Sequence, residues 1–327
     1  GGAKGAVVVD AKQCSEKELE QITRSYVREF YEDIGPNTDI PAPDMYTNSR
    51  IMGWAADEYI KMSKKPEAGA FTGKPIKLGG IEGREIATSY GAICVLDEYL
   101  KTSKLFDVKS KLSCIIQGAG NAGANAAKLA ADMGIMVVGI SDSKGGVYDP
   151  RGFDVDKLIT CKLTHGSIKH CVEKDLSVEG LDLEHVQILT NQQLLAKPCD
   201  ILILSALEDQ ITEVNAKDVQ AQVVLEIANG PVTPEAEAIL NKKNIQVLPD
   251  ILVNAGGVCV SYFEWLQNSS GTNWSRQEVL EKLDKRIRKA YKDIQSLKNY
   301  YDCNYRTAAY IKALKSLNLI WEHNNPS

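Results

Sequence analysis

One stretch of the sequence combines a glycine turn with the elements that flank a bound dinucleotide. Residues 113–123 run from a short apolar segment into Gly118-x-Gly120-x-x-Gly123, and a helical pattern continues to residue 133. In this pattern the first glycine permits a tight turn, the second lets the backbone approach a pyrophosphate, and the third brings the helix close to the sheet. The start of the helix offers N–H groups and a positive dipole end to phosphates. The stretch therefore predicts a dinucleotide site.

A second buried-strand pattern follows the helix and ends in a carboxylate. Residues 135–140 are apolar, and Asp142 lies 22 residues beyond Gly120. A carboxylate at this position accepts hydrogen bonds from the hydroxyls of an adenine ribose. A lone glycine pattern would be weak, but two strands, a helix and an acid in the right order favour the dinucleotide interpretation.

Two residues in the first 50 could carry acid–base chemistry. Lys4 lies in the glycine-rich turn at residues 1–5, and Asp44 follows Asp39-Ile-Pro-Ala-Pro. Taken alone, Lys4 is better explained as a solvated lysine, because most lysines are exposed. Asp44 is better explained, on its own segment, as the N-cap of a helix over 51–62. The alternative is that both take part in proton transfer.

The remaining patterns predict alternating strands and helices. Buried-strand patterns at 201–204, 222–227 and 245–250 alternate with helices, which favours an α/β fold with a doubly wound parallel sheet. Helices are expected at 15–30, 51–62, 89–101, 154–163, 167–173, 275–297 and 307–321, and a turn at 142–146. Asn229 and Asn254 would lie at the carboxyl ends of strands, where ligands bind. Both could equally form turns beside glycine.

Bulk properties exclude several classes of protein. A chain of 327 residues suffices for two domains, and a change of pattern places a boundary near residue 80. The net charge of -5 gives no basic surface for nucleic acid, and no apolar run approaches the roughly 20 residues that span a membrane. Eight scattered cysteines predict free thiols in a reducing compartment, and no metal site is expected. No targeting segment is visible, which favours the cytoplasm, or the mitochondrial matrix in a eukaryote.

Nine motifs, taken in order, resemble the glutamate dehydrogenase family, whose members act on Glu, Leu, Phe or Val. They are Gly-Gly-Ala-Lys4-Gly, Asp39-Ile-Pro-Ala-Pro-Asp44, Thr72-Gly-Lys-Pro, Gly83-Arg-Glu-Ile-Ala-Thr88, Gln117-Gly-Ala-Gly-Asn-Ala-Gly123, Ser141-Asp-Ser-Lys-Gly-Gly146, Ala228-Asn-Gly-Pro231, Pro249-Asp-Ile-Leu-Val-Asn254-Ala-Gly-Gly257 and Ser261-Tyr-Phe-Glu-Trp265. They cover essentially the whole chain.

The resemblance implies reversible oxidative deamination of L-glutamate to 2-oxoglutarate and ammonium. By this resemblance Lys4 activates water and Asp44 moves protons to and from the amino group. Two residues, Thr72 and Ser261, would bind the side-chain carboxylate of the substrate. The cofactor would contact Thr88, Gly118, Gly120, Asn121, Ala122, Gly123, Asp142, Ser143, Asn229 and Asn254. Asp142 favours NAD, because a carboxylate repels a 2′-phosphate, although Lys144 and the nearby serines are also compatible with NADP.

The resemblance also implies an organisation into domains. Residues 1–80 would be the remainder of a partial α/β substrate and oligomerisation domain, and residues 81–299 the Rossmann-like NAD(P) domain. Helical residues 300–327 would pack back on the first domain. In the family a segment with two substrate-binding lysines precedes Gly-Gly-x-Lys, so the chain is expected to be a fragment whose activity that loss could abolish. The parent is expected to be a homohexamer. The alternatives are a branched-chain or aromatic amino-acid dehydrogenase and a catalytically dead nucleotide-binding module.

Overall fold

The computed structural model describes residues 3–103, 111–172 and 184–324. The first two glycines of the Lys4 motif, residue 173 of the helix expected over 167–173, and residues 325–327 of the C-terminal segment lie outside them. The chain forms two compact units: Gly1–Ala87 with Gly257–Leu283, and Thr88–Gly256 with Asp284–Ser327. Three helices cross from one unit to the other: α3 (Arg84–Thr102), α9 (Ala255–Ser270) and α10 (Arg276–Tyr301).

The first unit is helical in the residues described. Besides its parts of the shared helices it contains α1 (Glu16–Glu29), α2 (Ser49–Ser63) and the 3₁₀ turns η1 (Ala68–Ala70) and η2 (Ile76–Leu78). Ser15 and Glu18 form the expected capping box at the start of α1. Asn48, not Asp44, caps α2, so Asp44 is not needed for that role. The core of this unit consists of Val27, Ile34, Met52, Ala55, Ala56, Tyr59, Ala70 and Phe71.

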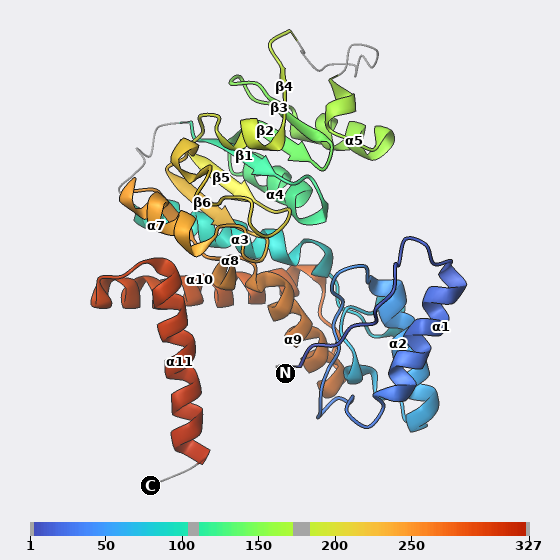
Figure 1. The fold of residues 1–327 in the computed structure, drawn as a ribbon. Helices are drawn as coiled ribbons and strands as arrows, with labels where there is room; N and C mark the ends of the chain where they lie inside the picture. The colour runs from blue at the N-terminus through green and yellow to red at the C-terminus, as the bar shows by residue number, and fades with distance from the viewer. Residues whose placement is uncertain (1–2, 104–110, 173–183, 325–327) are drawn as a thin grey trace. The chain divides into compact units, whose positions relative to one another are not determined.

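The second unit is built on a seven-stranded sheet (Figure 1). Its strands are β1 (Ser113–Gln117), β2 (Met136–Asp142), β3 (Gly145–Tyr148), β4 (Gln187–Leu189), β5 (Ile201–Leu204), β6 (Val223–Glu226) and β7 (Gln246–Leu248). They lie in the order β4-β3-β2-β1-β5-β6-β7. The five strands from β2 to β7 in this order are parallel, which confirms the doubly wound α/β prediction.

Strands β3 and β4 were not predicted. Residues from Gly145 onward turn back and pair antiparallel with β2, and β4 pairs antiparallel with β3. The turn expected at 142–146 therefore continues directly into a strand. Strands β5 and β6 are buried at every residue, so both faces of the sheet are covered there.

The helices of the second unit, besides the shared ones, connect and cover the strands. They are α4 (Asn121–Asp132), α5 (Val155–His165), η3 (Lys169–Cys171), α6 (Asn191–Leu195), η4 (Ala216–Asp218), α7 (Pro234–Lys242), α8 (Asp250–Val253) and α11 (Tyr305–Asn324). The helix expected over 167–173 is only the short turn η3 in the residues described. Helix α4 packs on β1 and β2, and α11 contacts β7 and α8. The chain passes from β1 to β2 on one side, and β5 lies on the other side of β1. The carboxyl end of β1 is thus the switch point at which such sheets bind ligands.

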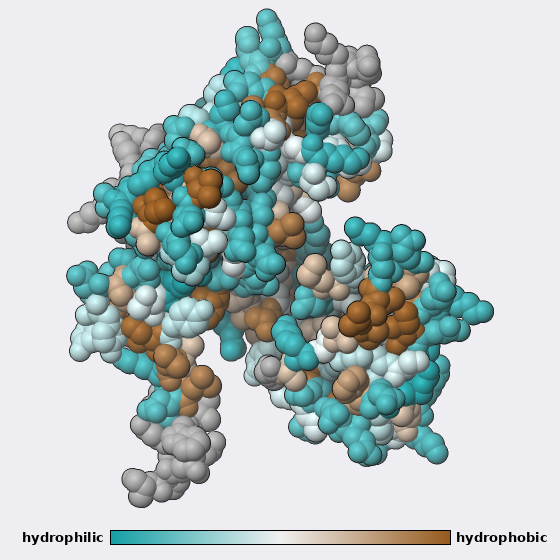
Figure 2. Space-filling view, in the orientation of Figure 1, coloured by the Kyte–Doolittle hydropathy of each residue, from teal (hydrophilic) through white to brown (hydrophobic). Residues whose placement is uncertain are grey.

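On the face shown in Figure 2, hydrophilic residues cover most of the surface and apolar residues form separate patches. None of the helices in the described part of the chain is long and apolar enough to span a membrane.

The expectation that all cysteines are free thiols is wrong at one pair. Cys161 in α5 and Cys171 in η3 form a disulfide. Gly166 adopts a left-handed conformation at the end of α5 and reverses the chain, so the two Cα atoms lie 5.9 Å apart, within the range that a disulfide bridges. Sequence spacing alone could not reveal this turn. The other cysteines form no disulfide, and Cys94, Cys114 and Cys199 are buried.

Loss of this disulfide should destabilise the second unit. For a loop of this length, Cys161→Ser should lower the free energy of unfolding by about 2–3 kcal/mol, because the unfolded chain regains conformational freedom. Urea unfolding with and without a reductant measures the effect, and Cys303→Ser at a half-buried free thiol is the control. Equal urea midpoints for the oxidised and reduced protein would contradict the prediction.

Candidate functional site

The structure brings together the two residues expected to do acid–base chemistry. Although 40 positions separate them, the Lys4 Nζ and Asp44 Oδ2 atoms lie 3.4 Å apart in the first unit. Asp44 is fixed by a local turn, in which its Oδ1 accepts the N–H of Met45 and its own N–H donates to Thr47. Both side chains are exposed, by 89% for Lys4 and 71% for Asp44. The first unit thus pairs an amine with a carboxylate, but it leaves both groups in contact with water.

A buried ion pair shapes the loop that carries Thr72. The Lys74 Nζ lies 2.7 Å from the Glu264 carboxylate, and both side chains are fully buried. Glu264 also accepts the N–H groups of Gly73 and Lys74, so one carboxylate fixes the loop to α9. Burial lowers the pKa of Lys74, although the attraction of Glu264 opposes this. The Thr72 hydroxyl, held by this loop, is buried without a hydrogen-bond partner.

Ser261, the second residue expected to contact a substrate carboxylate, is paired with a cation that sequence reasoning did not single out. The Arg84 Nη1 donates to the Ser261 Oγ at 2.5 Å. Burial lowers the pKa of the Arg84 guanidinium below its usual value. In the described part of the chain no carboxylate lies within 4.0 Å of Arg84, so its charge is not compensated by an ion pair. Arg84 is the first residue of α3, where the helix dipole disfavours a cation; that unusual placement was the available signal.

The glycine turn of the second unit has the form that a pyrophosphate site requires. Gly118 has φ +98°, and a Cβ on Gly123 would lie 1.8 Å from the Gly118 carbonyl oxygen. A Cβ on Gly120 would meet nothing within 4 Å, so the surface there is open. Gly120 is also the N-cap of α4 and brings no side chain to the helix start. Asn121 and Ala122 form its first turn, and the Ser205 hydroxyl supports the loop by donating to the Gly118 carbonyl. These features fit a dinucleotide phosphate at the start of α4.

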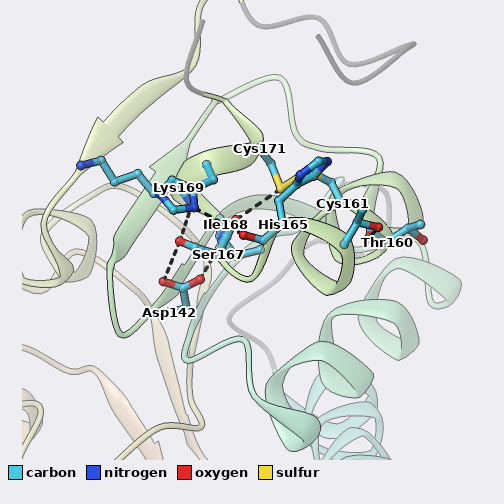
Figure 3. Close-up of a disulfide and its surroundings, with 10 residues drawn as sticks. Asp142, Thr160, Cys161, His165, Ser167, Ile168, Lys169 and Cys171 are labelled. Carbon is cyan, nitrogen blue, oxygen red and sulfur yellow. Dashed lines mark hydrogen bonds between the residues drawn. A yellow bond between two sulfur atoms is a disulfide. The ribbon is translucent and has the colours of Figure 1, made fainter. Parts of the chain in front are cut away.

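Asp142 ends β2 next to the disulfide segment (Figure 3). Its Oδ2 accepts the Ile168 N–H at 2.6 Å, and its Oδ1 accepts the Lys144 N–H at 2.8 Å. The Ser167 hydroxyl also donates to Oδ1, at 3.4 Å. These contacts fix the carboxylate at the strand tip and leave it acceptor capacity for a ribose hydroxyl. Ser143 follows it in an exposed position.

The two asparagines expected near a nicotinamide contact each other. The Asn254 Nδ2 donates to the Asn229 Oδ1 at 2.6 Å. Asn229 follows β6 and Asn254 follows β7, as predicted for the carboxyl edge of the sheet. Thr88 lies half-buried in α3, and the next residue, Ser89, donates from its hydroxyl to the Ala122 carbonyl at 2.7 Å. This bond ties α3 to the first turn of α4.

A buried carboxylate, that of Glu226, ends β6 close in sequence to Asn229. Glu226 is fully buried and forms an ion pair with Arg306 of α11. Burial raises the pKa of Glu226 to about 7, an effect that Arg306 and the backbone N–H of Asp250 oppose and the negative charge of Asp250 reinforces. Glu226 and Arg306 were not singled out from the sequence, because their pairing depends on tertiary structure.

The raised pKa of Glu226 predicts a pH dependence of stability. Because the folded value of about 7 lies above the ordinary 4.5, Glu226 contributes stability that is fully present below pH 4.5 and is lost as the pH rises through 7. Relative to Glu226→Gln, which does not titrate, the unaltered chain should lose about 1–3 kcal/mol between pH 5 and 8. Urea unfolding of both proteins at the two pH values measures this. A constant difference between them would contradict it.

The arrangement is suited to acid–base chemistry. The first unit pairs a primary amine with a carboxylate and places the Arg84 cation against the Ser261 hydroxyl, and the second unit has a dinucleotide turn with a fixed acid. Among the described residues there is no group of three His, Cys, Asp or Glu side chains that could hold a metal ion.

Family models match most of the chain. Residues 79–323 match the family model of Glutamate/Leucine/Phenylalanine/Valine dehydrogenase, and residues 1–61 match the Glu/Leu/Phe/Val dehydrogenase dimerisation domain. The chain belongs to the Glu/Leu/Phe/Val dehydrogenase family. It is therefore a member of a family of oxidoreductases.

Curated and solved members of this dehydrogenase family match almost the whole chain. An NAD-specific glutamate dehydrogenase of Staphylococcus aureus is 42% identical over 315 residues, which cover 96% of this chain and 72% of that protein. The hetero-hexameric glutamate dehydrogenase of Thermus thermophilus, in a Leu-bound form, matches with a TM-score of 0.87 at 33% identity over 98% of this chain and 72% of the other. Glutamate dehydrogenase from Peptoniphilus asaccharolyticus matches with a TM-score of 0.78 at 34% identity, over 97% of this chain and 73% of the other.

Proposed function

We propose that the chain catalyses the NAD-dependent, reversible oxidative deamination of L-glutamate to 2-oxoglutarate and ammonia. One observation separates glutamate from the apolar substrates of the family. Among the residues that the structure describes, Arg84 has no carboxylate within ion-pair distance, although the charge of Glu264 attracts it, and it donates to Ser261. The Thr72 hydroxyl is buried and has no partner. A substrate carboxylate would satisfy both groups, whereas an apolar side chain would leave them unpaired at a cost of about 1–3 kcal/mol for each polar group.

Lys4 and Asp44 supply the proton transfers in this proposal. Bound NAD would supply a hydride acceptor for the Cα hydrogen of glutamate. Asp44 takes a proton from the substrate amino group before the imine forms. Lys4 then removes a proton from the water that attacks the imine carbon, which gives a carbinolamine, and Asp44 returns a proton to its nitrogen. The C–N bond breaks, ammonia leaves, and the hydroxyl proton of the carbinolamine passes to solvent as the 2-oxo group forms. The 3.4 Å separation of the two side chains supports their acting together.

NAD rather than NADP is the proposed cofactor. The fixed carboxylate of Asp142 suits the free 2′-hydroxyl of NAD and repels the 2′-phosphate of NADP. The turn from Gly118 to Gly123 suits the pyrophosphate. The Staphylococcus aureus relative is an NAD-specific enzyme, which agrees with this preference.

The two units divide the proposed work. The first unit, which includes all of the expected substrate domain 1–80, provides the substrate groups, and the second provides the cofactor groups. We further propose a homohexamer; the Thermus thermophilus relative is a hetero-hexamer, which supports an assembly of six subunits. Sedimentation velocity would test this assembly.

A panel of amino acids tests the proposed substrate. With NAD, the chain should reduce the cofactor with L-glutamate and much less with L-leucine, L-phenylalanine or L-valine. Arg84→Met should reduce the preference for glutamate, because it removes the cation and keeps the apolar stem. A preference for leucine, phenylalanine or valine would overturn the proposed substrate. Binding of NADH without turnover of any amino acid would overturn the proposed reaction.

A further inference from the structure

Arg306, in the second unit, has no part in the proposed proton or hydride transfers, yet it contacts three carboxylates. Its Nη2 donates to both carboxylate oxygens of Glu226 at 2.7 Å. Its Nε donates to Glu237 at 2.6 Å, and its Nη1 donates to the Asp250 Oδ1 at 3.0 Å. Because a guanidinium is a planar fork, these contacts fix the three acids relative to one another.

Asp250 connects this cluster to the two asparagines at the carboxyl edge of the sheet. Its N–H donates to Glu226 at 2.8 Å, which places the start of α8. Its Oδ2 accepts the N–H of Gly230, the residue after Asn229, at 2.8 Å. Its carbonyl oxygen accepts the N–H of Asn254 at 2.9 Å. Asp250 therefore bonds to the backbone of Asn254 itself and to the residue next to Asn229, so it helps to place both asparagines.

We propose that Arg306 is a positioning residue that orients Asn229 and Asn254 for the nicotinamide end of the cofactor. Without the guanidinium, Asp250 would lose one of the bonds that place it, and Glu226 and Glu237 would lose the group that they share with it. Gly230 has φ +54°, and its N–H donates to Asp250. A shift of Asp250 would therefore also move Gly230 and the adjacent Asn229. The inference rests on the proposed function, since it concerns how that site holds its cofactor.

Arg288 provides a matched control in the same unit. It also donates to three acids, Asp97, Glu98 and Asp284. Its side chain is 24% exposed, against 21% for Arg306. It joins α10 to α3, and none of its hydrogen bonds in the described part of the chain reaches Asp250 or either asparagine. Arg306→Gln and Arg288→Gln therefore make the same chemical change in similar surroundings.

The test compares binding of NADH with binding of ADP-ribose, which lacks the nicotinamide ring. Arg306→Gln should weaken NADH binding relative to ADP-ribose and lower kcat/KM for NAD by about ten- to a hundredfold, because small misplacements of binding groups are costly. ADP-ribose should bind within about twofold of the unaltered chain, since its contacts lie elsewhere. Arg306→Lys, which keeps the charge without the fork, should recover only part of the loss. Arg288→Gln should leave the ratio of the two affinities unchanged.

Each outcome decides the inference. Equal weakening of NADH and ADP-ribose, or an Arg288→Gln protein that changes their ratio as much, would show a general structural role and overturn it. Should Arg306→Gln not fold, the binding of NADH and of ADP-ribose is measured for Asp250→Asn instead. An unchanged ratio of the two affinities in that variant would also overturn the inference. If the unaltered chain does not bind NADH, the proposed function fails and the inference falls with it. If it binds NADH and the ratio is insensitive to Arg306, only the inference fails.

Discussion

Lys4→Ala should lower kcat for glutamate deamination by about a hundred- to ten-thousandfold, the range expected when a general acid–base group is lost. NADH binding should remain unchanged, because the glycine turn and Asp142 belong to a separate unit of the chain. Asp44→Asn should have an effect of similar size. The double variant should be little worse than either single one, because the two groups act as a pair. Steady-state kinetics together with NADH titration measures these effects.

Lys12 offers a control for the loss of positive charge at the N-terminal end. Lys12→Ala removes an exposed lysine of the same unit and should leave kcat within about twofold. Lys4→Arg should not restore activity, because arginine stays protonated and cannot exchange a proton with water or substrate. If the Lys4→Ala protein kept nearly full kcat, Lys4 would have no part in proton transfer, and the proposed role would be wrong.

The second large effect concerns stability and comes from the buried pair of Lys74 and Glu264. Lys74→Met should lower the free energy of unfolding by about 3–5 kcal/mol, because it leaves the Glu264 carboxylate buried without its counter-charge. Adding Glu264→Gln should recover part of the loss, since the amide oxygen can still accept from Gly73 and carries no charge. Urea unfolding of the three proteins measures both steps.

The exposed pair of Lys61 and Asp57 in α2 is the matched control. Its side chains are 61% and 43% exposed, so Lys61→Met should cost no more than about 1 kcal/mol. If Lys74→Met and Lys61→Met shift the urea midpoint equally, burial of the Lys74 pair contributes nothing special to the fold.

Local sequence signals predicted the second unit well. The strands β1, β2, β5, β6 and β7 depend on neighbouring residues, and they were found close to the expected positions. The β3–β4 hairpin was missed because its strands are short and β3 begins inside a glycine turn. Paired strands of this kind are specified by their partners more than by their own residues.

Contacts between distant residues were less accessible to sequence reasoning. Spacing alone favoured ordinary roles for Lys4 and Asp44, and only their motifs indicated a pair; the 3.4 Å approach depends on a fold that joins positions 40 apart. The pairings of Arg84 with Ser261, Lys74 with Glu264, and Arg306 with Glu226 join residues 177, 190 and 80 positions apart. No periodic pattern signals such pairs. Each is a polar group that folding buries, and a buried charge needs a partner.

The most direct test of the proposed reaction follows absorbance of the reduced nicotinamide during reductive amination. The purified chain is mixed with NADH, 2-oxoglutarate and ammonium, and each component is omitted in turn. The proposed function predicts oxidation of NADH that requires both 2-oxoglutarate and ammonium, with NADPH oxidised more slowly. No oxidation of either cofactor, by a folded chain that binds NADH, would contradict it.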